Sequence, residues 1–461
     1  MSGVGAPGLS ASAPPAQPQG QRRLLPPLRL PRALLDPGQS DLGCGDADGL
    51  LTVQLELDGG CVARIHPCDA SGAAGLDAGP ARASGGGEIP APSLAITPPV
   101  EPHVHLDKAF TWAAYPNRGG AMAGALAANL REGAHRSVEQ VLERGERALD
   151  RAWRYGLRAL RSHVDSGGPA AAPSWTALLA LRERWRGRVD LQLVALVPLA
   201  FWTTAEGGAL AQRVAAAGGL LGGVLGPPYP RSSGQVEDLR ALLKLADRLG
   251  CAVDLHVDEG AGQPGVGVAL VTRLLEREGW RLSITCSHSS SLGLLAEGPR
   301  WRLAERMAAV GLAVVALPTT NAWLLGRRHG LTTPERPLAP VRLLQQAGVA
   351  VALGADNVQD PWYPGGDFDP LELLRLSVRA VQLPPWQRQG LMPFTTVPSR
   401  LLDLAWDGVL RPGSPADLLV LGASSWSELL ARPPQRRVLR AGQWLPSAPD
   451  QAPDPRLEPF A

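Results

Sequence analysis

Residues 98–112 read PPVEPHVHLDKAFTW and decide how the rest of the chain is interpreted. They close a short apolar run, residues 94–100, that is typical of a buried strand. His103 and His105 stand two positions apart near the end of this strand, so their imidazoles point to the same face. Two imidazoles on one face supply half of a metal site. Two surface histidines give the same pattern, so further ligands must follow other strands.

Short apolar runs alternate with longer helical patterns from residue 96 onward. Strands are expected at 97–105, 157–164, 189–198, 220–226, 252–257, 282–287, 312–317 and 349–354. Helices are expected at 137–154, 174–185, 234–249, 267–278, 302–310, 340–347 and 370–383. This α/β alternation predicts a (β/α)8 TIM-like barrel. The alternative is a doubly wound open sheet, which would normally show a Gly-rich phosphate turn after its first strand, and none follows residues 97–105.

Both ends of the chain contain shorter β-like segments, at residues 50–57, 61–65, 408–422 and 438–445. We expect residues 23–95 and 401–446 to form one small β-sandwich, with the barrel of residues 96–400 inserted in it. Residues 1–22 and 447–461 are rich in proline and are expected to be loosely held tails. Residues 70–87 are rich in Gly and Ala and are expected to form a loop.

Charge and cysteine usage narrow the class of partner. The formal net charge is only +2, which gives no electrostatic reason to bind nucleic acid or an anionic membrane. Five cysteines without a CxxC pair indicate neither a disulfide framework nor a zinc ribbon, and a reduced, cytoplasmic protein is expected. We expect no membrane span and no secretory signal, because no apolar run approaches the ~18 residues required and the N-terminus lacks a charged start. The sequence leaves the oligomeric state open, including a homo-oligomer.

Polar residues follow several of the expected strands, at the barrel edge where catalytic residues of this fold lie. They are His103 and His105, His163 and Asp165, His256 with Asp258 and Glu259, His288, and Asp356 with Asn357. Two histidines from the first strand, His256 from the fifth and Asp356 from the eighth make a set of three nitrogens and one oxygen around a divalent ion. No lysine occurs in residues 191–230, where a two-metal barrel would need a bridging carboxylated lysine, so one metal is favoured.

Several motifs together carry a resemblance to a known family. They are PPVEPHVHLDKAF (98–110), RSHVD (161–165), DLHVDE (254–259), TCSHSS (285–290), GADNVQDPWYPGG (354–366) and ADLLVLG (416–422). With these motifs, residues 50–445 resemble the amidohydrolase superfamily and, within it, the cytosine deaminase-like branch. The resemblance implies a metal-dependent hydrolase that cleaves a C–N bond of a small N-heterocycle, by deamination.

The resemblance also implies roles for individual residues. His103, His105, His256 and Asp356 would bind one divalent metal, Zn or Fe, and Asp356 can also accept a proton from the water. Glu259 would shuttle a proton from the attacking water to the substrate nitrogen, His288 would stabilise the attacked centre, and Trp362 would wall the substrate pocket. A metal lowers the pKa of its bound water to ~7, and a partly buried carboxyl has a suitable pKa for the shuttle.

Three positions bear on the substrate. Leu199 stands where cytosine deaminases carry a glutamine that reads the pyrimidine edge, which argues against cytosine itself. Asn357 stands where cytosine deaminases carry the second of two successive aspartates. The lysine at position 108 resembles the branch of the superfamily that removes amino groups from triazine-like rings. Lys108 would hydrogen-bond a ring carbonyl, unless it is a solvated loop lysine. The alternatives are a triazine-type aminohydrolase or cyclic amide hydrolase, and a non-catalytic binding barrel.

Overall fold

The computed structural model describes residues 22–68, 91–229, 234–328, 330–333 and 335–446. The expected tails, apart from Arg22, and the expected loop at 70–87 therefore lie outside the described residues. Within the described ranges, no helix combines the length and the apolar character that crossing a membrane requires.

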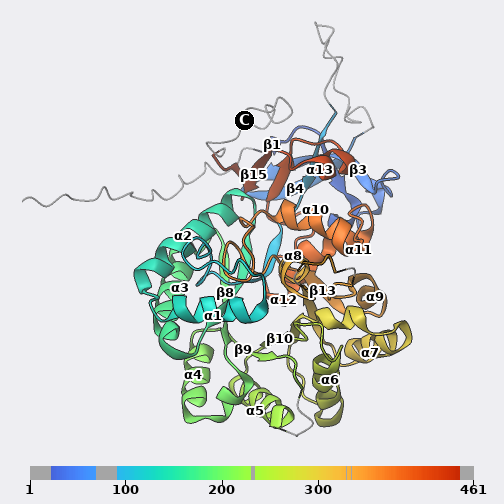
Figure 1. The fold of residues 1–461 in the computed structure, drawn as a ribbon. Coiled ribbons are helices and arrows are strands. Elements are labelled where there is room, and N and C mark those ends of the chain that lie inside the picture. The colour runs from blue at the N-terminus through green and yellow to red at the C-terminus, as the bar shows by residue number, and fades with distance from the viewer. Residues whose placement is uncertain (1–21, 69–90, 230–233, 329, 334, 447–461) are drawn as a thin grey trace, which may run out of the picture.

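Eight parallel strands form a barrel, which confirms the predicted fold class (Figure 1). They are β6 (Val100–Val104), β7 (Ala159–Asp165), β8 (Asp190–Leu196), β9 (Leu220–Leu225), β10 (Val253–Val257), β11 (Ile284–His288), β12 (Ala313–Ala316) and β13 (Ala350–Leu353). Each strand lies within its predicted range or ends one residue beyond it. Neighbours follow chain order, and the ring closes where the Asp356 N–H donates to the His103 carbonyl over 2.9 Å.

Helices alternate with the strands and cover the barrel. They are α1 (Met122–Gly133), α2 (Val138–Arg154), α3 (Ala171–Trp185), α4 (Ala205–Ala216), α5 (Gly234–Leu249), α6 (Val266–Glu278), α7 (Glu297–Ala309), α8 (Pro318–Leu324), α9 (Val341–Gln346), α10 (Pro370–Ala380), α11 (Arg388–Leu391) and α12 (Thr396–Leu401). Ser137 and Gln140 form the capping box that begins α2. The sequence pattern does not predict α1 and α4, because Ala and Gly dominate their sequences and weaken the helical pattern of apolar residues.

The two ends of the chain meet in a second, curled sheet, drawn with blue and red strands at the top of Figure 1. Its strands are β1 (Arg23–Leu24), β2 (Leu28–Pro31), β3 (Leu50–Asp58), β4 (Cys61–Pro67), β5 (Ser93–Ile96), β14 (Leu418–Leu421), β15 (Arg436–Arg440) and β16 (Gln443–Trp444), with α13 (Trp426–Ala431) between β14 and β15. β5 joins the two ends, since it pairs with β2 on one side and with β14 on the other. The barrel is therefore inserted between the halves of this small β unit.

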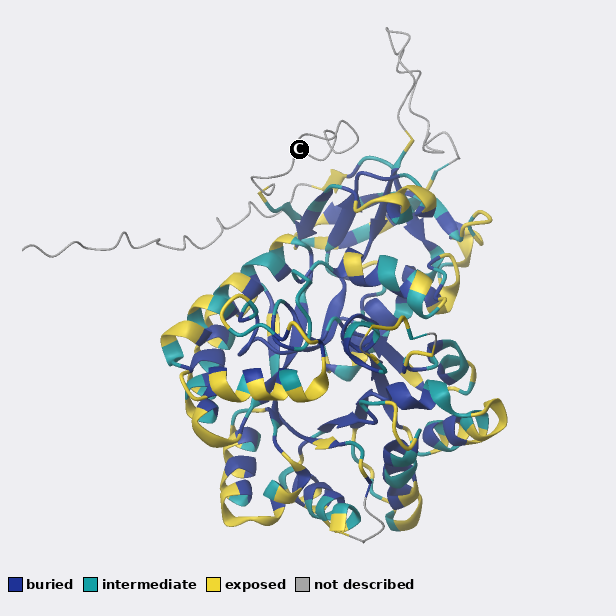
Figure 2. Cartoon of the chain, viewed as in Figure 1, coloured by how far each residue is buried: buried dark blue, intermediate teal, exposed yellow. Residues whose placement is uncertain are grey.

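The barrel mouth combines burial with backbone strain. β6, β10 and β11 are buried along their whole lengths, and Figure 2 shows the barrel strands in dark blue beneath helices with exposed outer faces. At the carboxyl ends of the strands, four non-glycine residues have left-handed φ values: Asp258 at 56°, His288 at 66°, Ser289 at 49° and Asp356 at 67°. Such conformations persist only where the surrounding structure holds them, and they concentrate at functional sites.

Candidate active site

Four of the predicted metal ligands converge at the carboxyl end of the barrel. The ring centroids of His103 and His105 lie 5.3 Å apart, and the His256 ring lies 4.7 Å from the first and 5.5 Å from the second. Asp356, just after β13, places Oδ1 3.2 Å from His105 Nε2 and 3.6 Å from His103 Nε2. The ligand atoms of His103, His105 and Asp356 lie within 4.8 Å of one another, and those of His103 and His256 also lie within that distance, so the four side chains gather around His103.

The donor atoms of this cluster suit a divalent cation. Nε2 of His103, both ring nitrogens of His256 and both Oδ atoms of Asp356 have no hydrogen-bond partner among the described residues. Burial, followed by the neighbouring imidazoles, lowers the pKa of His103 and His256 well below the usual value, so both rings are neutral and able to bind a metal. Unpaired buried polar atoms cost free energy, and one metal ion could bind one nitrogen of each imidazole together with a carboxylate oxygen of Asp356.

A chain of hydrogen bonds fixes which nitrogen of His103 faces the cluster. The Ser287 hydroxyl donates its only proton to Asp254 Oδ1 over 2.7 Å and lies 2.9 Å from His103 Nδ1. Nδ1 must therefore donate to Ser287, which leaves the lone pair on Nε2. Arg161 Nη1 donates to the other oxygen of Asp254 over 2.7 Å and anchors this chain. Such outer contacts orient a ligand and set its tautomer.

His288 has the opposite tautomer. Asn321 Nδ2 donates to His288 Nδ1 over 3.0 Å, which places the ring proton on Nε2. His288 Nε2 lies 3.6 Å from Glu259 Oε2 and has no hydrogen-bond partner in the described part of the chain. A protonated Nε2 does not bind a metal, although this histidine groups with His103 and His256 by distance. The geometry therefore suits His288 as a hydrogen-bond donor beside the metal.

Glu259 lies at the same mouth, three residues after His256. Its pKa is raised to about 8, first by burial and then by the charge of Asp356, while Lys108 opposes the shift. A carboxyl with a pKa near the working pH can both take and give a proton, which is the requirement for a shuttle. The sequence assigns that role to Glu259 by resemblance, and its side chain lines the same cavity as His105, His256 and Asp356.

The seam between β6 and β13 positions both the first-strand ligands and Asp356. Glu101, buried beneath them, accepts from the backbone N–H groups of His103 and Ala355, each over 3.0 Å. Gly354 leaves room for this carboxylate, because a Cβ there would lie 2.7 Å from Glu101 Oε1 and 3.2 Å from His103 Cβ. One buried carboxylate thus ties the start of the ligand set to its end.

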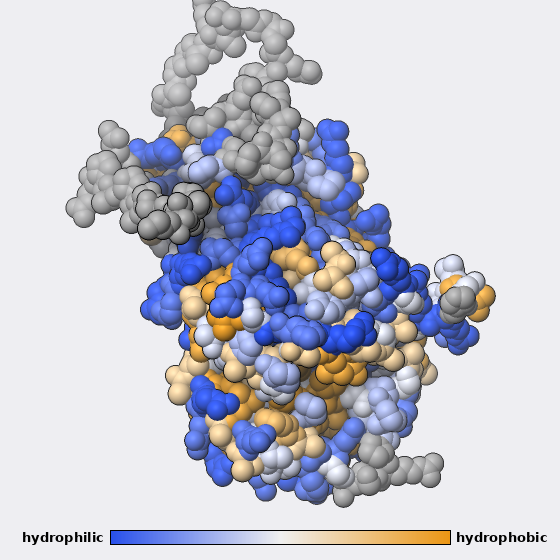
Figure 3. Space-filling view, turned by 60° about the vertical axis from the view of Figure 1, so that its left-hand side comes forward, coloured by the Kyte–Doolittle hydropathy of each residue, from blue (hydrophilic) through white to orange (hydrophobic). Residues whose placement is uncertain are grey.

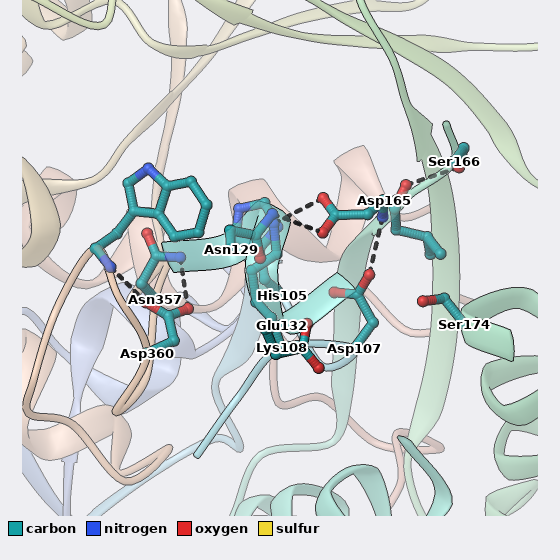
Figure 4. A network of polar contacts seen from close by, with 12 residues as sticks. His105, Asp107, Lys108, Asn129, Glu132, Asp165, Ser166, Ser174, Asn357 and Asp360 are labelled. Carbon is teal, nitrogen blue, oxygen red and sulfur yellow. Dashed lines mark hydrogen bonds and ion pairs between the residues drawn. The ribbon is translucent and has the colours of Figure 1, made fainter. Parts of the chain in front are cut away.

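A buried network of charges surrounds Lys108, as Figure 4 shows. Lys108 Nζ donates to Asp165 Oδ1 over 2.7 Å and lies 4.7 Å from the ring centroid of Trp362. Arg136 donates to Asp107 over 2.8 Å and to Asp165 over 3.2 Å. Burial opposes the charge of Lys108, but the carboxylates of Asp165 and Asp107 hold its pKa above the usual value. Lys108 is therefore a buried cation and not a solvated loop lysine.

A cavity of about 700 Å³ opens at this mouth. Eight predicted site residues line it: His105, His256, Glu259, His288, Asp356, Lys108, Asn357 and Trp362. The loop that carries the last two is fixed by Asp360, which accepts from Asn357 Nδ2 over 2.7 Å and from the Trp362 N–H over 2.9 Å.

Leu199 does not reach the cavity. The 3₁₀ helix η4 (Leu199–Thr203) begins directly after Pro198, and it turns the Leu199 side chain into the buried core against Gly223. Leu196, Val197 and Pro198 line the cavity from this strand end instead. The expectation that Leu199 contacts the substrate is therefore not met, because η4 begins at this residue and its side chain does not line the cavity.

Sequence analysis assigned no role to His163, Ser287 or Glu101. The ring of His163 stacks on His103 with centroids 3.8 Å apart, and its position at the end of the second strand was a usable signal. Ser287 is opposite His256 in the β10–β11 register, which only the paired strands reveal. Glu101 precedes His103 by two positions on the same strand face, so the period of a strand does point to it.

Comparisons with known proteins agree with this geometry. The model of the amidohydrolase family matches residues 113–445. Pterin deaminase of Rhizobium rhizogenes is 35% identical over 352 residues, which cover 76% of this chain and 80% of that protein.

Two solved structures resemble the chain over nearly its whole length. The structure of 5-methylcytosine deaminase from Klebsiella pneumoniae, liganded with 5-fluorocytosine, has a TM-score of 0.75 and 26% identity, with coverage of 94% of this chain and 98% of that one. The structure of N-isopropylammelide isopropylaminohydrolase from Burkholderia multivorans has a TM-score of 0.67 and 27% identity, with coverage of 91% and 98%. The likeness therefore includes both the barrel and the curled sheet.

Proposed function

Because this chain belongs to the amidohydrolase family, we propose that it is a metal-dependent hydrolase that deaminates a small N-heterocycle. The observation that carries the proposal is the gathering of His103, His105, His256 and Asp356, whose buried ring and carboxylate atoms lack partners among the described residues, in the cavity that Glu259 also lines. A binding barrel without catalysis has no need for a carboxyl with a pKa near 8 next to such a set.

One divalent metal is proposed, held by His103, His105, His256 and Asp356. Three nitrogens and one carboxylate oxygen suit either Zn or Fe. The only lysines of the chain are Lys108 and Lys244. Lys108 is engaged by Asp165 and Lys244 is exposed on helix α5, so neither is placed to bridge a second metal. When bound, the metal would act as a Lewis acid that makes a water molecule acidic enough to attack at neutral pH.

The protein's own groups would then move the protons. Glu259 would take a proton from the attacking water and deliver it to the ring nitrogen, and would then carry a second proton to the leaving amine. The water oxygen bonds to the ring carbon, and one water proton goes to the ring nitrogen. The second proton then passes to the amino group, the C–N bond breaks, and ammonia leaves as the ring carbon becomes a carbonyl. His288 would donate from Nε2 to the group that becomes negative in this step, with Asn321 holding the tautomer.

Lys108 and Trp362 are proposed to hold the ring. The buried ammonium would donate a hydrogen bond to a ring carbonyl, and the indole would lie against the ring face. Asn357 would contribute a polar contact from the same wall. We also propose residues 96–400 as the hydrolase barrel and 23–95 with 401–446 as its supporting β unit. Pterin deaminase, 35% identical, supports a pterin-like ring as the first substrate to test.

The test begins with the purified protein. Bound metal is measured by elemental analysis, and ammonia release is measured with pterin, cytosine, isocytosine and ammelide. We expect about one metal per chain and turnover of at least one ring. Glu259→Gln should retain the metal and lose about 10²–10⁴-fold in turnover. A wild-type protein that binds no metal and releases no ammonia from any ring would contradict the proposal.

A second candidate is removal of an alkylamino group from a triazine ring. The likeness to N-isopropylammelide isopropylaminohydrolase favours it, together with a cavity larger than a single ring needs. Release of the alkylamine and not of ammonia, measured on N-alkylated ammelides in the same panel, would distinguish the two reactions.

A further inference from the structure

The cavity at the barrel mouth is polar at its floor and apolar at its opening. The floor carries the candidate ligands and Lys108. The mouth is formed by Met122, Leu126 and Leu130 of α1 on one side and by Val224 of β9 on the other. The three α1 residues are spaced four apart, so they form one stripe along the helix. An apolar rim thus surrounds a polar floor.

This rim holds a large share of the exposed apolar surface. Seven large apolar side chains are exposed in the described part of the chain, and four of them are these rim residues. Figure 3 shows apolar side chains, in orange, gathered around a hollow in the lower half of the molecule. Exposed apolar patches of this kind mark surfaces that are covered when a ligand or partner binds.

The volume of the cavity is larger than a single heterocyclic ring requires. At about 30 Å³ for each water-sized group, 700 Å³ has room for about twenty non-hydrogen atoms, whereas a cytosine-sized ring has about eight. Polar groups that would bind such a ring are concentrated at the floor, which leaves the apolar space toward α1 unfilled. A volume of 700 Å³ is typical of pockets for larger organic ligands.

We propose that the substrate is a heterocycle with an apolar substituent several carbons long, which extends from the ring toward α1 and packs on Met122, Leu126, Leu130 and Val224. The inference rests on the proposed function for the ring and the reaction. It adds a binding subsite whose contacts do not depend on turnover. A second copy of the chain covering α1 is the competing occupant, and the test below separates the two.

The probe is a series of pterins with hydrogen, ethyl, butyl or hexyl at the 6-position, whose fluorescence reports binding directly. Burial of one methylene contributes ~0.8 kcal/mol, which corresponds to about a threefold to fourfold gain in affinity. We expect Kd to fall by about two- to fourfold for each added carbon, since the rim stays partly open to water. Ammonia release is measured on the same compounds.

The matched variants are Leu126→Ser with Leu130→Ser, and Leu331→Ser as control. Leu130 and Leu331 are equally exposed, at 65% and 67%, but Leu331 does not line the cavity. The double variant should bind unsubstituted pterin as the wild type does and lose most of the gain with chain length. Leu331→Ser should keep the full gain. Because both cavity positions are exposed, unfolding temperatures should stay close to that of the wild type.

Each outcome bears on the inference. A Kd that does not change with chain length overturns it, even if ammonia is released, and so does an unchanged gain in the double variant. A gain with chain length that the double variant abolishes supports it, even if no ammonia appears and the proposed deamination fails. Absence of binding by every pterin counts against both. A change of oligomeric mass in the double variant assigns the rim to contact between copies and overturns the inference.

Discussion

Replacement of Ser287 by alanine should loosen metal binding without touching a ligand. The Ser287 hydroxyl links His103 Nδ1, at 2.9 Å, to Asp254 Oδ1, at 2.7 Å. Without it, nothing fixes the proton of His103 on Nδ1, and the tautomer with Nε2 protonated cannot bind the metal. Loss of such an outer contact typically costs 10–100-fold in metal affinity, or about 1.4–2.7 kcal/mol.

The same substitution should also destabilise the fold. Asp254 is fully buried and would lose one of its hydrogen bonds, which costs about 1–3 kcal/mol for a buried acceptor. Metal affinity is measured by competition with a chelating dye at pH 7, and the free energy of unfolding is measured by urea denaturation in the presence of a strong chelator. The two measurements separate the effect on the ligand from the effect on the fold.

Ser291→Ala is the matched control. Ser291 is also buried, and its hydroxyl accepts from the Gly265 N–H over 2.9 Å, with no contact to the ligand cluster. We expect Ser291→Ala to lose a similar amount of stability and to keep wild-type metal affinity. If Ser287→Ala binds the metal as tightly as Ser291→Ala does, then Ser287 only packs between strands and the inferred tautomer control is refuted.

Three further predictions concern charge, packing and substrate contacts. In the protein without metal, burial and the charge of Asp356 raise the pKa of Glu259 to about 8, so this carboxyl is protonated at pH 7. A bound cation offsets the repulsion between the two carboxylates and lowers the pKa of Glu259. Metal binding should therefore release about one more proton in the wild type than in Glu259→Gln, by calorimetry in two buffers, and equal release would contradict this. Gly354→Ala places a Cβ 2.7 Å from Glu101 Oε1 and should cost about 1–3 kcal/mol of stability in denaturant unfolding. Lys108→Met should lower kcat/KM by about 10–100-fold for rings with a carbonyl, and an equal loss on a ring without one would exclude the proposed hydrogen bond.

The sequence was sufficient for the features that local periodicity controls. Each barrel strand could be placed because a buried parallel strand reads as a short apolar run, and residues directly after it must lie at the mouth. His256 and Asp356 could therefore be grouped with His103 although they are far apart in the chain. Helix α1 was not predicted, and with it the apolar rim was missed, because its buried positions, Ala125, Ala128, Glu132 and Gly133, are not an apolar core stripe and its large apolar residues lie on the exposed side.

Contacts between side chains of different strands could not be predicted from the sequence, for a different reason. Ser287 meets His103 only because of how the strands are placed around the ring, and such placement is a property of paired strands and not of one segment. Leu199 shows the same limit at smaller scale, since the 3₁₀ helix that begins at this residue places its side chain in the core and not in the cavity. Positions taken from a family pattern are therefore safest within strands and weakest at the first residue of a loop.

The seam between β6 and β13 explains why ligand placement and barrel closure depend on each other. The Asp356 N–H closes the ring by donating to the His103 carbonyl, and the side chains of the same two residues are proposed metal ligands. Glu101 holds both sides of the seam through backbone N–H groups, so it sets the distance between the two ligands. A metal bound by both side chains would pull on the same seam that the backbone bond closes. Metal binding should therefore stabilise the whole barrel, and damage to the seam should weaken the metal site before it exposes the core.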